Sequence, residues 1–213
     1  MATLETIQLE HIPATHSVHV ALYKDIQNAE FLQQQLLSRN QDFEYAFIDA
    51  SCVVSRLQVL AAVHKAIMIQ SGGNMKTPNI HSEIVCSLSP TNNIAEAYRR
   101  FGITPTSKDI IIVKVLISPA SSSSSSSPPP EQTATAETVA AHLAAHVQGT
   151  PSSFTDAVVA QGTDWAKVRK YYKLNSGVAV LDGLPKGGAD GGDEARRREL
   201  ETLVLGGMAL RGI

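Results

Sequence analysis

Residues 110–117 read Ile-Ile-Ile-Val-Lys-Val-Leu-Ile, and this run is the strongest indicator of the fold. An almost unbroken apolar stretch of this length is typical of a central strand that other elements cover on both faces. Residues 17–23 differ, because Val18, Val20 and Leu22 alternate with their neighbours as in a half-buried strand. Together the two runs predict a sheet with a buried centre.

Two helices are predicted between these strands. Asn28 is the expected cap of the first, which runs to about Ser38. The second ends at Gly72-Gly73. Its apolar face consists of residues at helical spacing: Leu57, Leu60, Ala61, His64, Ile67 and Met68.

The stretch 83–103 predicts a strand followed by a short helix. Ile84, Cys86 and Leu88 alternate with other residues, which favours a strand. Asn92 or Asn93 then caps a helix that ends before Gly102. The side chains at helical spacing in it are Ile94, Ala97, Tyr98 and Phe101, of which we expect Phe101 to be core.

The domain organisation follows from two shifts in composition. Residues 118–136 are rich in serine and proline and residues 177–193 are rich in glycine, so we predict two disordered insertions. Helical patterns resume near Glu137 and again from about Glu194 to Leu210. We therefore predict one α+β domain over residues 1–213, with a central, mostly antiparallel sheet flanked by helices.

Composition limits the kinds of ligand. The chain of 213 residues has a formal net charge of −2, so nucleic acid could be held only by a local basic patch. Its two cysteines, Cys52 and Cys86, lie in apolar runs, which fits a reducing compartment. Neither a basic, apolar leader nor a membrane-spanning run is evident. We expect a nuclear and cytoplasmic protein.

Catalytic and metal-binding motifs are weak. The run 72–77 has Met75 where a phosphate-binding loop needs glycine before Lys76, so no nucleotide cofactor is predicted. His142 and His146 share the spacing of two metal ligands on a helix, but no third ligand is evident, and we predict no metal. An enzyme that uses Cys86 or His64 remains an alternative, and no small-molecule substrate is expected.

Basic residues provide a candidate RNA site. Lys65, Lys76, Arg99 and Arg100 lie near one another in sequence, which predicts phosphate contacts without base readout. The helix expected at 164–174 is a rival patch, with Lys167, Arg169, Lys170 and Lys173. Solvated helix faces without a ligand are the plainer interpretation of both clusters.

The run His81–Ile103, which includes Ser-Leu-Ser-Pro-Thr-Asn-Asn-Ile at 87–94, resembles the signature of the small PRPK-binding subunit of the KEOPS (EKC) complex. Three other stretches agree with that family: residues 22–29, residues 58–66 with 75–77, and the basic Tyr-Lys-Leu segment 168–174. Thr91 departs from the pattern, since a third consecutive asparagine is often found there.

The resemblance implies a non-catalytic α/β subunit that docks on the small lobe of a kinase-like ATPase and tunes it allosterically. It also implies a role in forming threonylcarbamoyladenosine next to the tRNA anticodon, with help in holding the tRNA 3′ end. Fungal members are tied to telomere maintenance as well. A free-standing RNA-binding module is the other alternative, and the expected partners are the kinase-like subunit and tRNA.

We expect the kinase-like partner to contact the apolar side of the short helix and the turn before it. The residues predicted to make this contact are Pro90, Asn93, Ile94, Ala97 and Tyr98. A helix of about two turns is not stable alone, so part of this face must be core and part can be interface.

Overall fold

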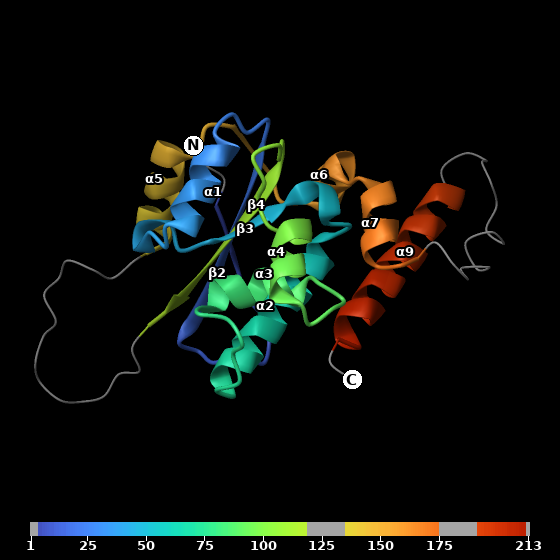
Figure 1. The fold of residues 1–213 in the computed structure, drawn as a ribbon, viewed down its shortest axis with the longest axis horizontal. Helices are drawn as coiled ribbons and strands as arrows, with labels where there is room; N and C mark the ends of the chain where they lie inside the picture. The colour runs from blue at the N-terminus through green and yellow to red at the C-terminus, as the bar shows by residue number, and fades with distance from the viewer. Residues whose placement is uncertain (1–3, 119–134, 175–190, 212–213) are drawn as a thin grey trace, which may run out of the picture.

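The computed structural model describes residues 4–118, 135–174 and 191–211. Strands and helices alternate irregularly along the chain (Figure 1), which confirms the α+β class. The strands are β1 (Glu5–Ile7), β2 (His16–Lys24), β3 (Ala46–Asp49), β4 (Ile110–Ile117) and β5 (Thr150–Ser152). The α-helices are α1 (Ala29–Leu37), α2 (Arg56–Ser71), α3 (Ile80–Ser87), α4 (Ile94–Phe101), α5 (Ala136–His146), α6 (Asp156–Gly162), α7 (Trp165–Tyr171) and α9 (Gly191–Ala209). Two short 3₁₀ helices, η1 (Gln41–Phe43) and η2 (Ala50–Cys52), flank β3.

The sheet is antiparallel throughout and has the strand order β1-β2-β4-β3, with β5 also paired to β2. The predicted central strand is confirmed, because β4 pairs with β2 on one edge and with β3 on the other. Val113 thus lies between Val20 and Ala46.

Helices cover both faces of the sheet and create two cores. On one face Ile111 and Val113 pack with residues of α2 and α3, and on the other Ile110 and Ile112 pack with α1 and α5. Figure 1 shows these helix pairs on opposite sides of the strands. β2 is buried on both faces too, since Ala21 and Tyr23 join the second core, so it is not the half-buried strand predicted.

The predicted strand at 83–88 is wrong, because these residues belong to α3 and its C-terminal cap, Leu88. Asn79 begins the helix by accepting a hydrogen bond from Ser82 N at 2.8 Å. Seven of the eight residues of α3 are buried, so the helix has no polar face that would reveal a helical period. A short apolar run of this kind fits a strand equally well.

Helices α2 and α4 match their predicted positions. Asn93 caps α4 through its side chain, which accepts from Glu96 N at 3.0 Å. Gly102 follows α4, and a Cβ there would lie 2.6 Å from the carbonyl oxygen of Tyr98. Asn28 precedes α1 as expected, but its side chain makes no cap bond and instead links to His146 O and Gln148 N.

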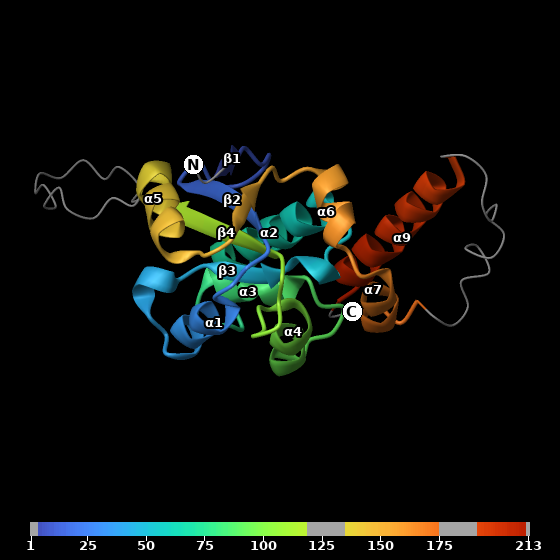
Figure 2. The ribbon, with the colours of Figure 1, turned by 90° about the horizontal axis from the view of Figure 1, so that it is seen from above.

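The two predicted insertions fall largely outside the described residues. Residues 119–134 and 177–190 are not described, so disorder there stays a prediction. The predicted boundaries are too wide, because Ala136 already belongs to α5 and residues 191–193 belong to α9. In Figure 2, α6, α7 and α9 gather at the end of the molecule opposite α5.

Candidate binding surfaces around helix α4

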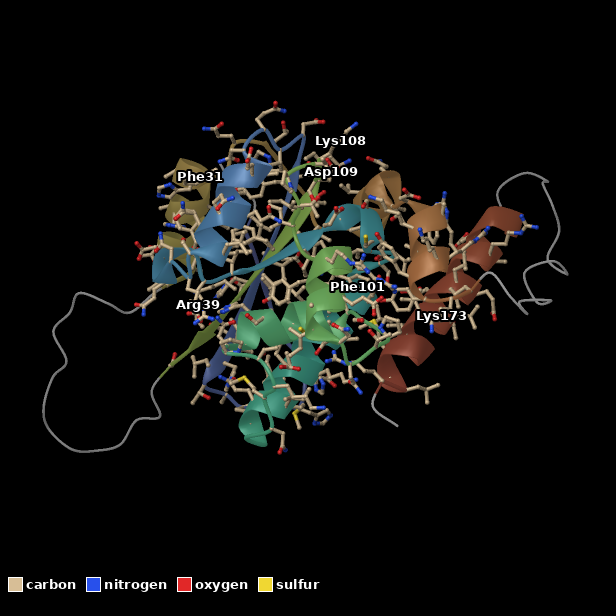
Figure 3. All side chains as sticks on the ribbon, in the orientation of Figure 1. Phe31, Arg39, Phe101, Lys108, Asp109 and Lys173 are labelled. Carbon is tan, nitrogen blue, oxygen red and sulfur yellow. The ribbon has the colours of Figure 1, made fainter. Side chains whose placement is uncertain are left out.

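Helix α4 has a buried side and a free side. Phe101 is 0% exposed in the first core, as predicted, and Figure 3 shows it within the body of the protein. Ala97 is only 1% exposed, so it fastens the helix and offers no surface to a partner. Ile94, in contrast, is 38% exposed, so part of this large apolar side chain is open to solvent.

The exposed end of α4 meets the last described residues of the chain. Arg211 donates from Nε to Asn92 Oδ1 at 3.1 Å and from Nη1 to the carbonyl oxygen of Cys86. Leu210, the residue before it, is 66% exposed. The Arg211 side chain thereby ties the chain end that carries exposed Leu210 to the turn before Ile94. We call the surface formed by Pro90, Asn92, Asn93, Ile94, Leu210 and Arg211 the docking surface.

Leu210 and Arg211 were missed in the sequence prediction. No local pattern near residue 210 indicates contact with residue 92, because the hydrogen bond joins residues 119 positions apart. Pro90, Asn93 and Ile94 are the predicted partner-binding residues that lie on this surface. Tyr98 is half-buried and faces a different hollow.

That hollow is a groove of about 840 Å³ between α1 and α4. Its apolar lining includes Leu36, Leu37, Tyr45, Tyr98 and Ile103. Leu37 is 69% exposed, so the groove opens widely to solvent. Arg39, just after α1, and Arg99 of α4 supply its two positive charges, and Glu44 supplies one negative charge. The combination of aromatic rings and guanidinium groups suits a ligand that has flat apolar parts and anionic groups.

The two arginines of α4 have different environments. Arg100 forms an ion pair with Glu96, donates to the carbonyl oxygen of Tyr171 at 3.2 Å and lies over the Tyr171 ring at 5.1 Å. Arg99 has a side chain that is 76% exposed and only a 3.8 Å contact with Glu96. Arg100 therefore joins α4 to α7, whereas Arg99 stays available to a ligand in the groove.

Lys65 and Lys76 also differ in whether another residue engages their charge. Lys65 donates from Nζ to the carbonyl oxygen of Met208 at 2.8 Å, near the C-terminal end of α9, where a cation is favourable. Lys76 is exposed in the loop before α3, two residues from Pro78, which lines the groove. The four residues predicted to bind RNA thus do not form one patch. Arg99 and Lys76 lie near the groove, and Lys65 and Arg100 hold α9 and α7.

The rival basic patch on α7 is partly engaged as well. Lys167 donates to Ser51 Oγ at 3.1 Å, while Arg169, Lys170 and Lys173 are exposed. Figure 3 shows Lys173 on the opposite side of the molecule from Arg39 of the groove. One small ligand cannot contact both patches.

His142 and His146 pack against aromatic rings. The His142 ring stacks on Tyr45 with a centroid distance of 5.6 Å, and its Nδ1 lies 2.9 Å from the Tyr45 hydroxyl. Burial, with a contribution from His146, lowers the pKa of His142. Among the described residues, no three His, Cys, Asp or Glu side chains are placed to hold a metal ion.

The alternative of a catalytic Cys86 gains no support from its surroundings. Its thiol is 0% exposed, and burial raises its pKa to about 11, so the reactive thiolate is scarce at neutral pH. His64 is half-buried on α2. Within the described part of the chain, no helix is long and apolar enough to cross a membrane.

Together, the fold, the docking surface and the groove define a small α+β protein that has two surfaces open to a binding partner. The model of a family described as "Kinase binding protein CGI-121" matches residues 23–212 of the chain. The chain is 49% identical over 211 residues to the EKC/KEOPS complex subunit cgi121 of Neurospora crassa, covering 99% of both chains. It is also 49% identical to the subunit of the same name from Gibberella zeae, again over 99% of each, and 32% identical to that of Schizosaccharomyces pombe, over 74% of this chain and 82% of the relative. The chain belongs to the CGI-121 kinase-binding protein family.

Proposed function

We propose that the chain is a non-catalytic subunit of an EKC/KEOPS complex and binds the kinase-like ATPase subunit through the docking surface. The observation that carries this proposal is that Arg211, the neighbour of exposed Leu210, bonds Asn92 and Cys86, and so ties the end of the chain to the segment before exposed Ile94. An exposed apolar centre with a polar rim is the usual composition of a protein interface. Family membership and the names of the relatives support the kinase-like partner.

Co-purification with the kinase-like subunit of the same organism tests the proposal. Ile94→Asp puts a charge at the apolar centre and should abolish co-purification, because a desolvated, unpaired carboxylate is costly. Leu57→Asp is the matched control, since Leu57 is 53% exposed at the start of α2 and lies outside the docking surface. Equal recovery of the partner with both folded variants would contradict the site.

The proposal includes an allosteric effect on the partner and a role in threonylcarbamoyladenosine formation on tRNA. An effector of this kind must change the ATPase rate of the kinase-like subunit when the two are mixed. Ile94→Asp should remove that change at concentrations at which the native chain saturates its partner. A free-standing RNA-binding module would leave the ATPase rate unaltered.

The groove is our candidate for the tRNA contact. Half-buried Tyr98 offers a ring on which a base can stack, and Arg39 and Arg99 can hold phosphates. Lys76 on the neighbouring loop extends the positive charge. Measurement of tRNA affinity for Tyr98→Ala, with Tyr171→Ala as a control in α7, tests this placement. Nuclear and cytoplasmic localisation is part of the proposal, and a telomere role stays a prediction from the family resemblance.

A further inference from the structure

Tyr172, just after α7, lies where several helices meet. Its hydroxyl donates to the carbonyl oxygen of Leu88, which caps α3, and accepts from Gln58 Nε2 of α2 at 2.9 Å. Its ring packs edge-on against Phe101 of α4 with centroids 5.8 Å apart. A Cβ on Gly207 of α9 would lie 3.2 Å from the ring, so α9 approaches Tyr172 closely at a glycine.

The hydroxyl is held in a fixed direction. Gln58 is 0% exposed, and its Oε1 accepts from Val54 N at 2.8 Å, which leaves Nε2 to point at Tyr172. Tyr172 is 7% exposed, and burial raises the pKa of its hydroxyl, which therefore stays protonated and able to donate. Both hydrogen-bonding roles of this group are used.

Both segments of the docking surface, residues 90–94 and residues 210–211, depend on the contacts of Tyr172. Leu88 is followed by the turn that contains Pro90 and Thr91. Thr91 Oγ1 donates to Glu96 Oε2 of α4 at 3.2 Å, so this turn is fastened to α4. On the other side, the same Gly207 Cβ position would lie 3.8 Å from Pro90. Tyr172 therefore contacts the end of α3, one face of α4 and the part of α9 that precedes Leu210.

We propose that Tyr172 is a positioning residue for the docking surface: it fixes the α3–α4 turn against α9 so that Ile94 and Leu210 present one apolar patch to the partner. The proposal rests on the proposed function, because it concerns the same surface. It assigns a role in partner binding to a buried residue that is not part of the docking surface. The structural reason is that an interface formed by two separate segments binds well only when the segments are held in a fixed position relative to each other.

Isothermal titration of the purified kinase-like subunit into full-length variants tests the proposal below the unfolding temperature of each variant. Tyr172→Phe removes only the hydroxyl and keeps the ring against Phe101 and Gly207. We expect its affinity for the partner to fall about tenfold, at full stoichiometry, because Leu88 O loses its donor. Hydrogen exchange in residues 88–94 should accelerate in the unbound variant.

Two controls separate positioning from general stability. Tyr45→Phe removes a tyrosine hydroxyl bonded to His142 on the other face of the sheet, so it matches the chemistry away from the surface. Tyr171→Phe keeps the contacts of the neighbouring ring and carbonyl with Arg100. Both should bind within about twofold of the native chain, a difference of a few tenths of a kcal/mol.

The outcomes are distinct. If Ile94→Asp abolishes binding while Tyr172→Phe binds like the native chain, the proposal for Tyr172 is wrong and the docking surface stands. If Tyr172→Phe and Tyr45→Phe weaken binding equally, the effect is one of stability and the proposal also fails. If the native chain does not bind the kinase-like subunit, the proposed function fails and the role of Tyr172 falls with it.

Discussion

The docking surface and the groove share helix α4 but are supported by different parts of the chain. The groove is lined by residues 33–104 only, so the first half of the chain builds it. The docking surface needs Leu210 and Arg211, and the contacts that hold its support come from α7 and α9. Changes in the C-terminal third should therefore impair partner docking and spare the groove.

The same division explains why basic residues that lie close together in sequence have different roles. Lys65 and Arg100 face the C-terminal helices and make short contacts with backbone carbonyl groups there. Arg99 lines the groove with a side chain that is 76% exposed, and Lys76 is exposed as well, so both charges are open to solvent. A basic residue near a candidate site is thus informative only once its partners are known.

The largest effect is expected from a change beneath both surfaces. Phe101→Ala removes a fully buried ring from the first core and should lower the free energy of unfolding by about 3–5 kcal/mol. Urea denaturation measures this loss, and both binding activities should disappear together. Ile94→Ala, at a site 38% exposed, should cost far less, and similar losses for the two variants would contradict the division of α4 into core and surface.

A smaller effect should separate the two surfaces. Arg100→Met leaves the Tyr171 carbonyl without its donor and weakens the hold on Glu96, so we expect a loss of about 1–3 kcal/mol in the free energy of unfolding. Arg99→Met should change it by less than about 0.5 kcal/mol. In binding assays Arg100→Met should weaken partner docking, while Arg99→Met should weaken tRNA binding. If Arg100→Met weakened tRNA binding and Arg99→Met weakened partner docking, the division between the two surfaces would be wrong.

A fall in pH should destabilise α3, which supports both the docking surface and the groove. His81 accepts from Val115 N at 3.1 Å, and burial lowers its pKa to about 3. Because the folded pKa lies below the unfolded value of 6.5, this contribution is full above pH 6.5 and declines as pH falls toward 3. Between pH 7 and pH 5.5 the native chain should lose about 1 kcal/mol from this group alone.

His81→Gln is the control for the acid effect. The variant cannot take up a proton at residue 81 in the unfolded chain, so its stability should fall less steeply over the same interval. The measurement is urea denaturation at several pH values for both proteins. Parallel curves would show that His81 does not carry the acid sensitivity.

The smallest effect on folding is expected in the groove, where the readout is salt dependence. Arg99→Glu and Lys76→Glu should leave the unfolding midpoint nearly unchanged and flatten the log–log salt dependence of tRNA affinity by about 0.7–0.9 per lost phosphate contact. Lys170→Glu with Lys173→Glu, on the rival patch, should leave that slope unaltered. A flattened slope only in the rival variant would move the RNA site to α7.

The fold was predictable where patterns are local and one-sided. The apolar run 110–117 and the side-chain cap at Asn93 both indicate their elements without reference to the rest of the chain. Helix α3 was missed because it is buried on nearly every side, which removes the polar face that shows a helical period. β3, with four residues, is too short for a periodic signal.

The candidate site was predictable only in part, for a similar reason. Ile94 stands out from sequence as an apolar residue near a polar cap, but the contact between Arg211 and Asn92 depends on the path of the whole C-terminal third. The roles of Lys65 and Arg100 likewise depend on carbonyl groups 143 and 71 residues away. Sequence spacing carries no information about such contacts.

Hydrogen exchange of the chain, alone and in complex with the kinase-like subunit, tests the central claim most directly. The docking surface predicts slower exchange in residues 88–98 and 205–211 on binding, with no change in α1 and η1 along the groove. Protection confined to α1 and η1, with residues 88–98 and 205–211 unaffected, would contradict the docking surface.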